Sequence, residues 1–585
     1  MFSTRDIFKA RKVTRADIFV IVVLATIILA VVTTAQRWTH HYQQEVTINL
    51  GVNALLGYSA LSFIRGIVAY LISFSLALLF GWLAARSSFW EQIILPFLDI
   101  GQSVPVLGFL PGLVLGLISI FPTYNIGLEI ACILLIVTSQ IWNIAFAFYA
   151  SLKNIPQEFY EVAKISRLSY FSRFLKIDLP FSATPLAWNS LVSIAGGWFF
   201  LTVCESFQLN GQSFRIPGLG SYMSEALNQG NQQAIWMGIG AMMVLIILLD
   251  FIVWRPIISW SQKFRVDDQP INDMDVPFVS LLYRQSKIAE YFSSLMRDLK
   301  YKLRRYEKPE EEKSPIENTA QTLPVNTEKK FKLNSLLLHM RKTLLLALGF
   351  VLAFWTFGKL YRLVEPLTWS EWGLIGYSCF LTFCRIFAAL ILSTIWALPV
   401  GILIGLSPKL TRIFQPIIQI IASFPSPMIF PLVFLLFYKM NIHLGISSVF
   451  ILVVGSQWYI LFNVLAGSSQ ISQQHKDSFH LMKLDWKDHW KRLYLPSVFP
   501  YLVTGWITAA GGAWNASIVA EYLEYGGKTY MCNGIGSVIT LATGTGNFPL
   551  LSAALMVMVG VVILLNRSVW KFLFHYAETR FKVEV

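Results

Sequence analysis

Long apolar stretches alternate with short polar ones along the chain. Each stretch is long enough to cross ~30 Å of hydrocarbon as a helix, which takes about 20 apolar residues. Barrel strands do not fit, because they are ~10 residues long and alternate in polarity. The pattern therefore predicts an all-α polytopic membrane protein. Its twelve expected transmembrane helices lie near 18–36, 60–84, 104–121, 127–149, 183–204, 235–257, 343–361, 376–404, 415–438, 444–466, 498–520 and 548–568.

A polar, basic segment interrupts the apolar pattern twice. Residues 158–180 read EFYEVAKISRLSYFSRFLKIDLP, and a diverged copy, KDSFHLMKLDWKDHWKRLYLP, occupies 476–496. In both copies an acidic residue, Glu161 or Asp477, stands 19 positions before the closing proline. The segments follow the fourth and the tenth expected helix, so both are expected on the same side of the membrane.

The repeat extends over both halves of the chain. Arg65 and Arg385 match at an offset of 320, and Glu205 and Glu521 match at an offset of 316. Because both copies have the same orientation, the sequence predicts two parallel six-helix domains.

The two domains are expected at 1–258 and 342–585, joined by a linker at 259–341. Within the linker, residues 277–303 place apolar side chains at helical spacing. This predicts an amphipathic helix that lies on the inner leaflet or on a partner, or packs on the protein's own loops. Acidic, basic and proline-rich runs in the rest of the linker favour partial disorder.

Composition and charge agree with this interpretation. Hydrophobic residues make up 55% of the chain and charged residues 14%, with a mean hydropathy of +0.57, whereas soluble domains are about a quarter charged. Lys and Arg collect near the N-terminus and in the repeated segments, so both termini, the linker and both segments are expected in the cytoplasm. The net charge of +14 indicates contact with anionic membrane lipids and not with nucleic acid.

Motifs for catalysis, metal ions or cofactors are not found in the sequence. YGGKT at 525–529 resembles the end of a phosphate-binding loop, but Tyr522 stands where that loop needs a glycine. The eight histidines show no metal-ligand spacing, and the five cysteines are interpreted as buried thiols. We therefore expect a transport protein, with no enzymatic activity, cofactor or metal of its own.

The repeated segment resembles the cytoplasmic coupling loop of ATP-binding-cassette importer permeases, written roughly E-A-A-x3-G-x9-I-x-L-P. The matching residues of the first copy are Glu161, Ala163, Ile177, Leu179 and Pro180, and those of the second are Asp477, Leu493, Leu495 and Pro496. Arg167 and Lys483 occupy the glycine position. A residue with a side chain can make the turn there, but at some cost unless φ stays negative.

The wider sequence is similar to the nitrate, sulfonate, taurine and bicarbonate branch of these permeases. The shared features include Ser-Gln-x-Trp at 139–142 and a Gly-Gly pair close to a tryptophan, which reads GGW at 196–198 and GGAW at 511–514. A glutamate and then GLG or GIG follow it. The resemblance implies two permease domains fused in one chain of the bacterial inner membrane. It also implies two copies of a separate ATPase, which hydrolyse the ATP, and a periplasmic or lipid-anchored substrate-binding protein.

The substrate is expected to be a small solute. An oxyanion such as nitrate, bicarbonate or a sulfonate is one hypothesis, suggested by the two arginines, and a vitamin precursor is another. An ion-coupled secondary transporter with a six-plus-six repeat is the rival prediction for the chain as a whole. Such a transporter would need no repeated docking loop.

Six polar or aromatic residues are candidates for the translocation pathway: Gln140, Gln457, Trp198, Trp514, Glu205 and Glu521. The alternatives are interhelical hydrogen bonding for the amides, core filling for the tryptophans and a helix-end carboxylate in water for the glutamates. Arg65 and Arg385 are interpreted as snorkelling to lipid headgroups, with substrate contact as the alternative. The Gly-Gly pairs at 196–197 and 511–512 are interpreted as close-packing sites, with a wider pore as the alternative.

Overall fold

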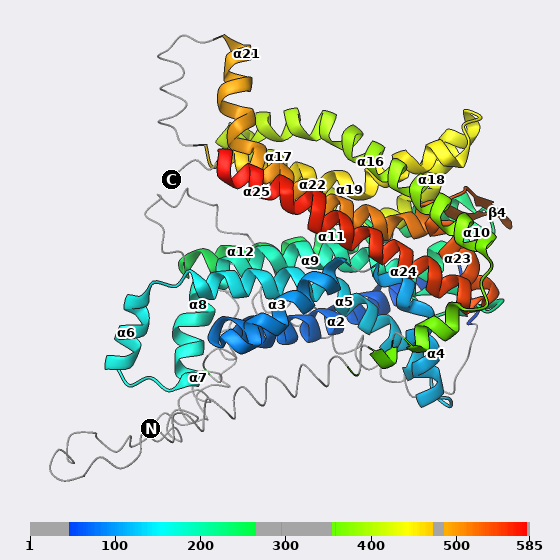
Figure 1. Ribbon diagram of the computed structural model, residues 1–585, viewed down its shortest axis with the longest axis horizontal. Helices are drawn as coiled ribbons and strands as arrows, with labels where there is room; N and C mark the ends of the chain where they lie inside the picture. The colour runs from blue at the N-terminus through cyan, green and yellow to red at the C-terminus, as the bar shows by residue number, and fades with distance from the viewer. Residues whose placement is uncertain are drawn as a thin grey trace, which may run out of the picture.

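The protein is a bundle of long helices, seen in a computed structural model (Figure 1). The structure describes residues 46–103, 105–264, 358–471 and 485–581, together with a few isolated positions between 294 and 356. The short helices α6 and α7 project from one end of the bundle, and two β-hairpins lie at the other. We call these the loop end and the hairpin end.

The first half begins with a 35-residue helix and ends with a helix that returns to the loop end. Its elements are α2 (Val52–Arg86), α3 (Ser88–Ser103), η2 (Val106–Phe109), α4 (Leu110–Ile120), α5 (Ile126–Lys153), α6 (Gln157–Ile165), α7 (Tyr170–Arg173), η3 (Phe174–Asp178), α8 (Leu179–Phe181), α9 (Ala183–Cys204), β1 (Ser206–Leu209), β2 (Gln212–Arg215), α10 (Leu219–Asn228), α11 (Gln232–Leu249), η4 (Asp250–Trp254), α12 (Arg255–Ser261) and η5 (Gln262–Phe264).

The second half repeats this order. Its elements are α16 (Trp369–Gly405), α17 (Pro408–Ala422), α18 (Ser426–Lys439), α19 (Leu444–Ser469), α21 (Trp486–Asp488), η6 (His489–Tyr494), α22 (Leu495–Ala520), β3 (Tyr522–Tyr525), β4 (Lys528–Met531), α23 (Ile535–Thr545), α24 (Phe548–Leu565), η7 (Asn566–Trp570) and α25 (Lys571–Phe581). Thus α2, α5, α9 and α11 correspond to α16, α19, α22 and α24.

Most of the expected transmembrane helices are present. Within the described residues, seven helices are long and apolar enough to cross a membrane, or eight if the bent pair α17–α18 counts as one span. The expected helix at 18–36 and most of the one at 343–361 lie outside the described residues, as do the predicted helix at 277–303 and nearly all of the linker.

The third apolar run of the second half is broken, and in the first half a similar break stands at the start of the third run. In the second half, α17 and α18 meet at 84°, and Pro425 stands at the break. In the first half, Pro105 occupies the equivalent place, just before η2. Proline has no N–H and disfavours a helical residue before it, so each proline separates two helical segments.

The two β-hairpins were not expected from the sequence. Their tips carry φ angles between 53° and 72° at Asn210, Gly211, Gly526 and Gly527. This geometry is typical of two-residue hairpin turns, for which Asn-Gly and Gly-Gly are favoured. The YGGKT sequence is therefore the tip of the second hairpin.

Each hairpin tip reaches across to the other half. The N–H of Asn210 donates to the carbonyl of Thr543 near the end of α23, at 3.1 Å. Reciprocally, the N–H of Gly526 donates to the carbonyl of Leu227 near the end of α10, at 2.9 Å. Each carbonyl also accepts from a residue that closes its own helix, Gly546 or Gly230, so the hairpin tip adds a second hydrogen bond at the helix end.

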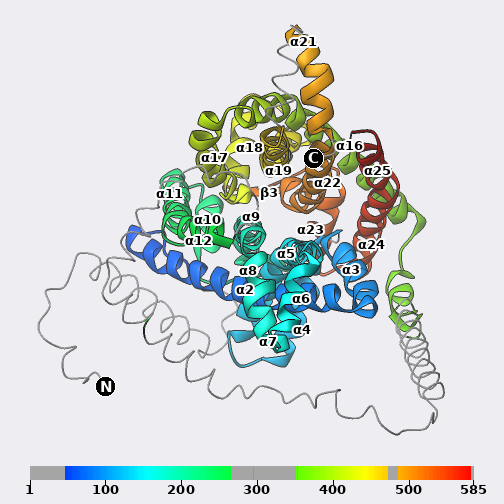
Figure 2. The same cartoon turned by 90° about the vertical axis from the view of Figure 1, so that its left-hand side faces the viewer.

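Figure 2 views the molecule from the loop end, with the helices of the two halves facing each other across the centre. Small residues allow close packing within each half. A side chain at Gly81 would collide with Phe148 of α5, and one at Gly401 would collide with Val464 of α19. Between the halves, Gly108 lies against Leu555 of α24.

Candidate functional site

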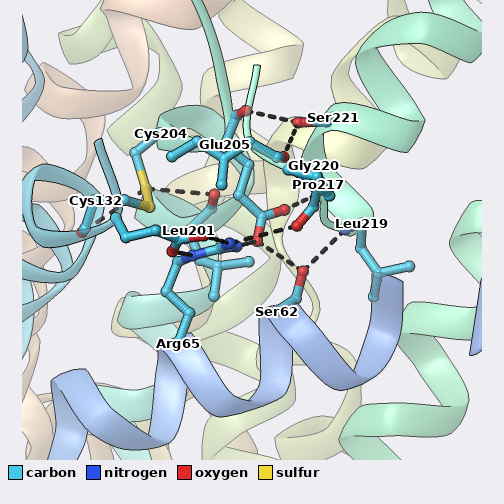
Figure 3. Close-up of polar contacts among 12 residues, drawn as sticks. Ser62, Arg65, Cys132, Leu201, Cys204, Glu205, Pro217, Leu219, Gly220 and Ser221 are labelled. Atoms are coloured by element: carbon cyan, nitrogen blue, oxygen red, sulfur yellow. Dashed lines mark hydrogen bonds and ion pairs between the residues drawn. A yellow bond between two sulfur atoms is a disulfide. The ribbon is translucent and has the colours of Figure 1, made fainter. Parts of the chain in front are cut away.

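A buried cluster of charged residues stands near the hairpin end of the first half (Figure 3). The guanidinium of Arg65 donates to both carboxylate oxygens of Glu129, at 2.7 and 2.9 Å, and also to Glu205. Arg65 is only 2% exposed and Glu205 is 0% exposed. The snorkelling interpretation of Arg65 is therefore wrong: its charge is balanced inside the protein by carboxylates from two other segments.

Glu205 sits in a cradle of hydrogen-bond donors. The hydroxyl of Ser62 donates to Glu205 Oε1 at 2.7 Å, and the N–H of Gly220 donates to Oε2 at 2.6 Å. The same hydroxyl accepts from the N–H of Leu219 at 2.9 Å. A side chain at Gly218 would come within 2.4 Å of the Glu205 carboxylate, so the GLG sequence lets the start of α10 approach it.

The second half repeats the cradle. The hydroxyl of Thr382 and the guanidinium of Arg385 donate to Glu521 Oε1 at 2.7 and 2.8 Å, and the N–H of Gly536 donates to Oε2 at 2.8 Å. Glu521 is also 0% exposed. Neither glutamate is therefore a helix-end carboxylate in water, and both tie α10 or α23 to the long helices.

The two clusters differ in the second partner of the arginine. Arg65 Nε donates to Glu129, whereas Arg385 Nε donates to the backbone carbonyl of Gly445 at 3.2 Å. Glu129 and Gly445 occupy matching positions at an offset of 316. The first half thus buries one additional carboxylate.

Two of the cysteines are not the buried thiols expected from the sequence. Cys132 on α5 and Cys204 at the end of α9 form a disulfide beside the Arg65 cluster (Figure 3). Cys379 is a buried free thiol, Cys532 is half-buried and Cys384 is exposed. Within the described residues, no group of three or more His, Cys, Asp or Glu side chains is placed to hold a metal ion.

Two cavities lie between the halves. The inner one, about 770 Å³, is lined by parts of α3, α5, α9, α17, α19 and α22 and extends toward the loop end. The outer one, about 420 Å³, is lined by the hairpins, α10, α23 and the ends of α9 and α22. Together the two cavities follow the interface from one end of the bundle toward the other.

The broken helices separate the two cavities. Val106 lines the inner cavity and Leu107 lines the outer one. In the second half, Ser426 lines the inner cavity and Pro427 lines the outer one. The side-chain oxygen of Asn515 on α22 accepts a hydrogen bond from the N–H of Val106 at 2.9 Å. This bond links the partition of the first half to a helix of the second.

The six pathway candidates do not line the inner cavity. Gln140 is buried and accepts a hydrogen bond from Ser73 at 3.1 Å. Trp198 and Trp514 are buried, and Trp198 packs against Gly66 of α2. Gln457 is half-buried and the two glutamates form the clusters above.

Residues next to the candidates in sequence reach the cavity instead. Ser139, Trp458 and Asn515 line it, each one position away from a candidate. Consecutive helical residues point about 100° apart, so the sequence identified these helices but not their inward faces.

The Gly-Gly pairs serve both roles considered for them. A side chain at Gly197 would collide with Gln140, and one at Gly512 would come within 3.0 Å of Tyr459. Gly196 and Gly511 line the inner cavity, and a side chain at either would meet nothing within 4 Å. One glycine of each pair allows close helix packing, and the other keeps the cavity wide.

The first repeated segment forms a helix–turn–helix that projects from the loop end (Figure 1). Arg167 makes the turn with φ of 47°. The N–H of Leu168 donates to Ala163 and that of Arg167 donates to Lys164, the bond pair of a helix end closed by a left-handed residue. The coupling-loop turn therefore forms with arginine in the usual glycine position.

The projecting helix α6 exposes its apolar side. Phe159, Val162 and Ile165 are exposed, Ile165 to 82%. Ala163 is buried, whereas Glu161 and Arg167 are exposed. An exposed apolar face on a short projecting helix is typical of a site that a partner covers.

A polar contact ties α6 to the bundle. The guanidinium of Arg86, at the end of α2, donates to both oxygens of Asp178 at 2.6 and 2.7 Å. The hydroxyl of Tyr160 on α6 donates to Asp178 at 3.2 Å, and the Arg86 guanidinium lies 4.7 Å from the centre of the Tyr160 ring. The matching positions of the second half are Leu406, Tyr494 and Lys476, so the contact belongs to the first half alone.

Less of the second repeated segment is described. Asp477 and Lys483 lie outside the described residues. Leu493 is buried in η6, and Leu495 and Pro496 are half-buried at the start of α22. In the first copy, Ile177, Leu179 and Pro180 are likewise half-buried just before α9.

Comparison with known proteins agrees with the duplicated architecture. Residues 77–254 and 397–583 both match the family described as "Binding-protein-dependent transport system inner membrane component". The chain belongs to this family. Its two matches are one permease domain in each half, so the internal repeat and the fusion of two permease domains are confirmed.

Among curated proteins, this permease is similar to the nitrate import permease protein NrtB of Synechococcus elongatus, with 28% identity over 29% of the chain and 58% of the relative. NrtB of Leptolyngbya laminosa is 27% identical over 32% of the chain and 63% of the relative. The bicarbonate transport system permease protein CmpB of a Synechocystis strain is 30% identical over 23% of the chain and 47% of the relative. The permease thus spans between about half and two thirds of the length of these relatives.

Proposed function

We propose that this chain is the membrane subunit of an ATP-driven importer, in which a small solute passes between the two halves. The observation that carries the proposal is the exposed apolar face of α6, on the segment that resembles the coupling loop of importer permeases. ATP hydrolysis would be performed by a separate ATPase, and this chain would provide the pathway.

Two copies of the ATPase would bind at the loop end, one at each repeated segment. In the first segment, Glu161, Ala163 and Arg167 would act in the docking part, and residues 177–180 lead from it toward α9. In the second, Asp477 and Lys483 would act in the docking part, and Leu493, Leu495 and Pro496 connect it to α22. Unequal sequences and the single Arg86–Asp178 contact support a larger contribution from the first segment.

A substrate-binding protein would dock at the hairpin end, in agreement with the family description. The loop end, both termini and the linker would face the cytoplasm, in the bacterial inner membrane. The basic composition of the repeated segments supports this orientation.

The pathway would run through the outer cavity, past the partition at Val106 and Ser426, into the inner cavity. Gln140, Gln457, Trp198 and Trp514 would support its walls from behind. Glu205 and Glu521 would hold the short helices α10 and α23 at its outer mouth.

The docking proposal is tested by placing charge on α6. Val162→Asp combined with Ile165→Asp changes two exposed side chains, so the membrane bundle should be unaffected. Burying such an apolar side chain in an interface contributes about 1.5–3 kcal/mol, so ATPase binding should fall by at least about tenfold. Copurification from native membranes, scored by ATP hydrolysis in the eluate, measures it.

Lys164→Ser is the matched control, because Lys164 is an exposed polar residue of the same helix. Undiminished copurification of the doubly substituted permease would refute docking on α6.

A further inference from the structure

The inner cavity has an unusual distribution of charge. Among its described lining residues there is no lysine, arginine or histidine, and Asp99 is the one acidic side chain. A chamber that held an anion by ion pairing would need a cation on its wall, because an unpaired charge is costly to remove from water. The described walls offer no such group.

The two arginines that suggested an oxyanion are already paired inside the protein. Arg65 is buried against Glu129 and Glu205, and Arg385 is bonded to Glu521. These arginines, which suggested an oxyanion at the level of sequence, balance carboxylates of their own chain. Neither lines the inner cavity.

The helix ends at the partition have few free N–H groups to offer an anion. The N–H of Val106 is bonded to Asn515, and that of Gly108 is bonded to the carbonyl of Pro105. At the start of α18, Pro425 and Pro427 have no N–H to donate. These helix ends therefore offer an anion few backbone N–H donors.

Aromatic rings and carboxamides contribute to the rest of the wall, beside aliphatic and small residues. Trp142, Trp188, Trp458 and Tyr459 line the cavity. Gln102, Asn143, Gln415 and Gln419 line it as well. Aromatic rings stack on planar groups and attract cations, and a carboxamide both donates and accepts hydrogen bonds. The volume of about 770 Å³ lies within the range of organic ligand sites.

We propose that the inner cavity accepts a planar organic solute without net negative charge, held by aromatic stacking and carboxamide hydrogen bonds. The inference rests on the proposed transport function and narrows its substrate class. It separates this chain from an importer whose membrane chamber recognises a small inorganic anion.

The test uses three probes of similar shape and different charge: nicotinate (anionic), nicotinamide (neutral) and the 1-methylnicotinamide cation, with nitrate as the inorganic anion. The full chain in lipid nanodiscs is dialysed against each probe, and bound solute is measured by chromatography. The neutral and cationic probes should bind at least about tenfold more tightly than nicotinate or nitrate, a difference of about 1.4 kcal/mol. Equal or tighter binding of either anion, or no binding of any probe, would overturn the proposal.

A substitution locates the binding. Gln415→Arg adds a cation to the cavity wall and should raise nicotinate binding by at least about tenfold. Gln157→Arg makes the same change on the exposed loop-end helix α6 and should leave nicotinate binding unchanged. Equal effects of the two substitutions would place the probes outside the cavity. Copurification with the ATPase is independent of these outcomes, so failure here is distinguishable from failure of the transport proposal.

Discussion

Asn515 of the second half holds the backbone of Val106 in the first half, through a hydrogen bond of 2.9 Å across the partition between the two cavities. The two residues are 409 positions apart in sequence. The contact supplies an acceptor to an N–H at the start of a broken helix, which has no partner within the helix itself.

Replacing Asn515 should therefore loosen the partition. Asn515→Leu leaves the N–H of Val106 without its acceptor, at a cost of about 1–3 kcal/mol. A cysteine introduced at Leu107 should then react faster with a thiol reagent added from the inner cavity side. Asn515→Asp keeps an acceptor oxygen, so in that background the cysteine at position 107 should react at the same rate as in the protein with Asn515. Equal labelling of Asn515→Leu and its parent would show that this bond does not hold the partition closed.

The charged cluster should respond unequally to loss of its two glutamates. Glu205→Ala removes an acceptor shared by Ser62, Arg65 and Gly220, and breaking a buried ion pair costs about 3–5 kcal/mol. Glu129→Gln should cost less, because Glu205 still balances Arg65. Thermal unfolding in detergent measures both variants. A smaller loss of stability for Glu205→Ala than for Glu129→Gln would contradict the assignment of Glu205 as the central acceptor.

The neighbouring glycines of α9 offer a matched pair. Gly197→Ala places a methyl group 2.2 Å from the Gln140 amide and should destabilise the protein by about 1–3 kcal/mol. Gly196→Ala meets nothing within 4 Å and should leave thermal stability unchanged or slightly higher. Because Gly196 lines the inner cavity, its effect should instead be on transport rate. Equal melting temperatures for the two variants would be inconsistent with this packing.

The contact between α6 and α2 should matter for coupling more than for ATPase binding. Asp178→Asn weakens the bonds with Arg86 and Tyr160 while leaving the exposed face of α6 unchanged. ATP hydrolysis by the assembled complex should persist, and solute accumulation in proteoliposomes should fall by on the order of tenfold, since about 1.4 kcal/mol of lost coupling corresponds to that factor.

Asp488→Asn is the control for this substitution, because Asp488 forms an exposed ion pair with Arg492 four residues away. Such pairs contribute little, so both activities should be retained. If Asp178→Asn lost ATP hydrolysis and solute accumulation to the same extent, Asp178 would act in binding of the ATPase and not in coupling.

Much of the architecture could be predicted from the sequence because helix length and repetition are local or periodic signals. The two parallel domains followed from matched residues such as Arg65 and Arg385, and their assignment as fused permease domains followed from the resemblance of the repeated segments. The environment of Arg65 could not be predicted. A single arginine in an apolar run gives the same pattern whether it faces headgroups or carboxylates 64 and 140 positions away.

Which face of each helix lines the cavity could not be predicted, for a related reason. An apolar bilayer and an apolar core impose similar compositions on all sides of a helix, so Gln140 and Ser139 could not be ranked by periodicity. The structure separates them: Ser139 lines the cavity, and Gln140 packs against Gly197. The hairpins were missed because their strands are four residues long and are stabilised by contacts with the opposite half.

The contacts between the two hairpins also affect which permease halves can pair with each other. Gln208 of the first hairpin donates to Glu524 of the second at 3.0 Å, and these two residues occupy matching positions of the repeat. Two second halves paired in the same way would bring two carboxylates face to face, and like charges so placed repel. Self-assembly of that half is thereby disfavoured, and fusion of the two domains supplies one complementary partner for every copy made.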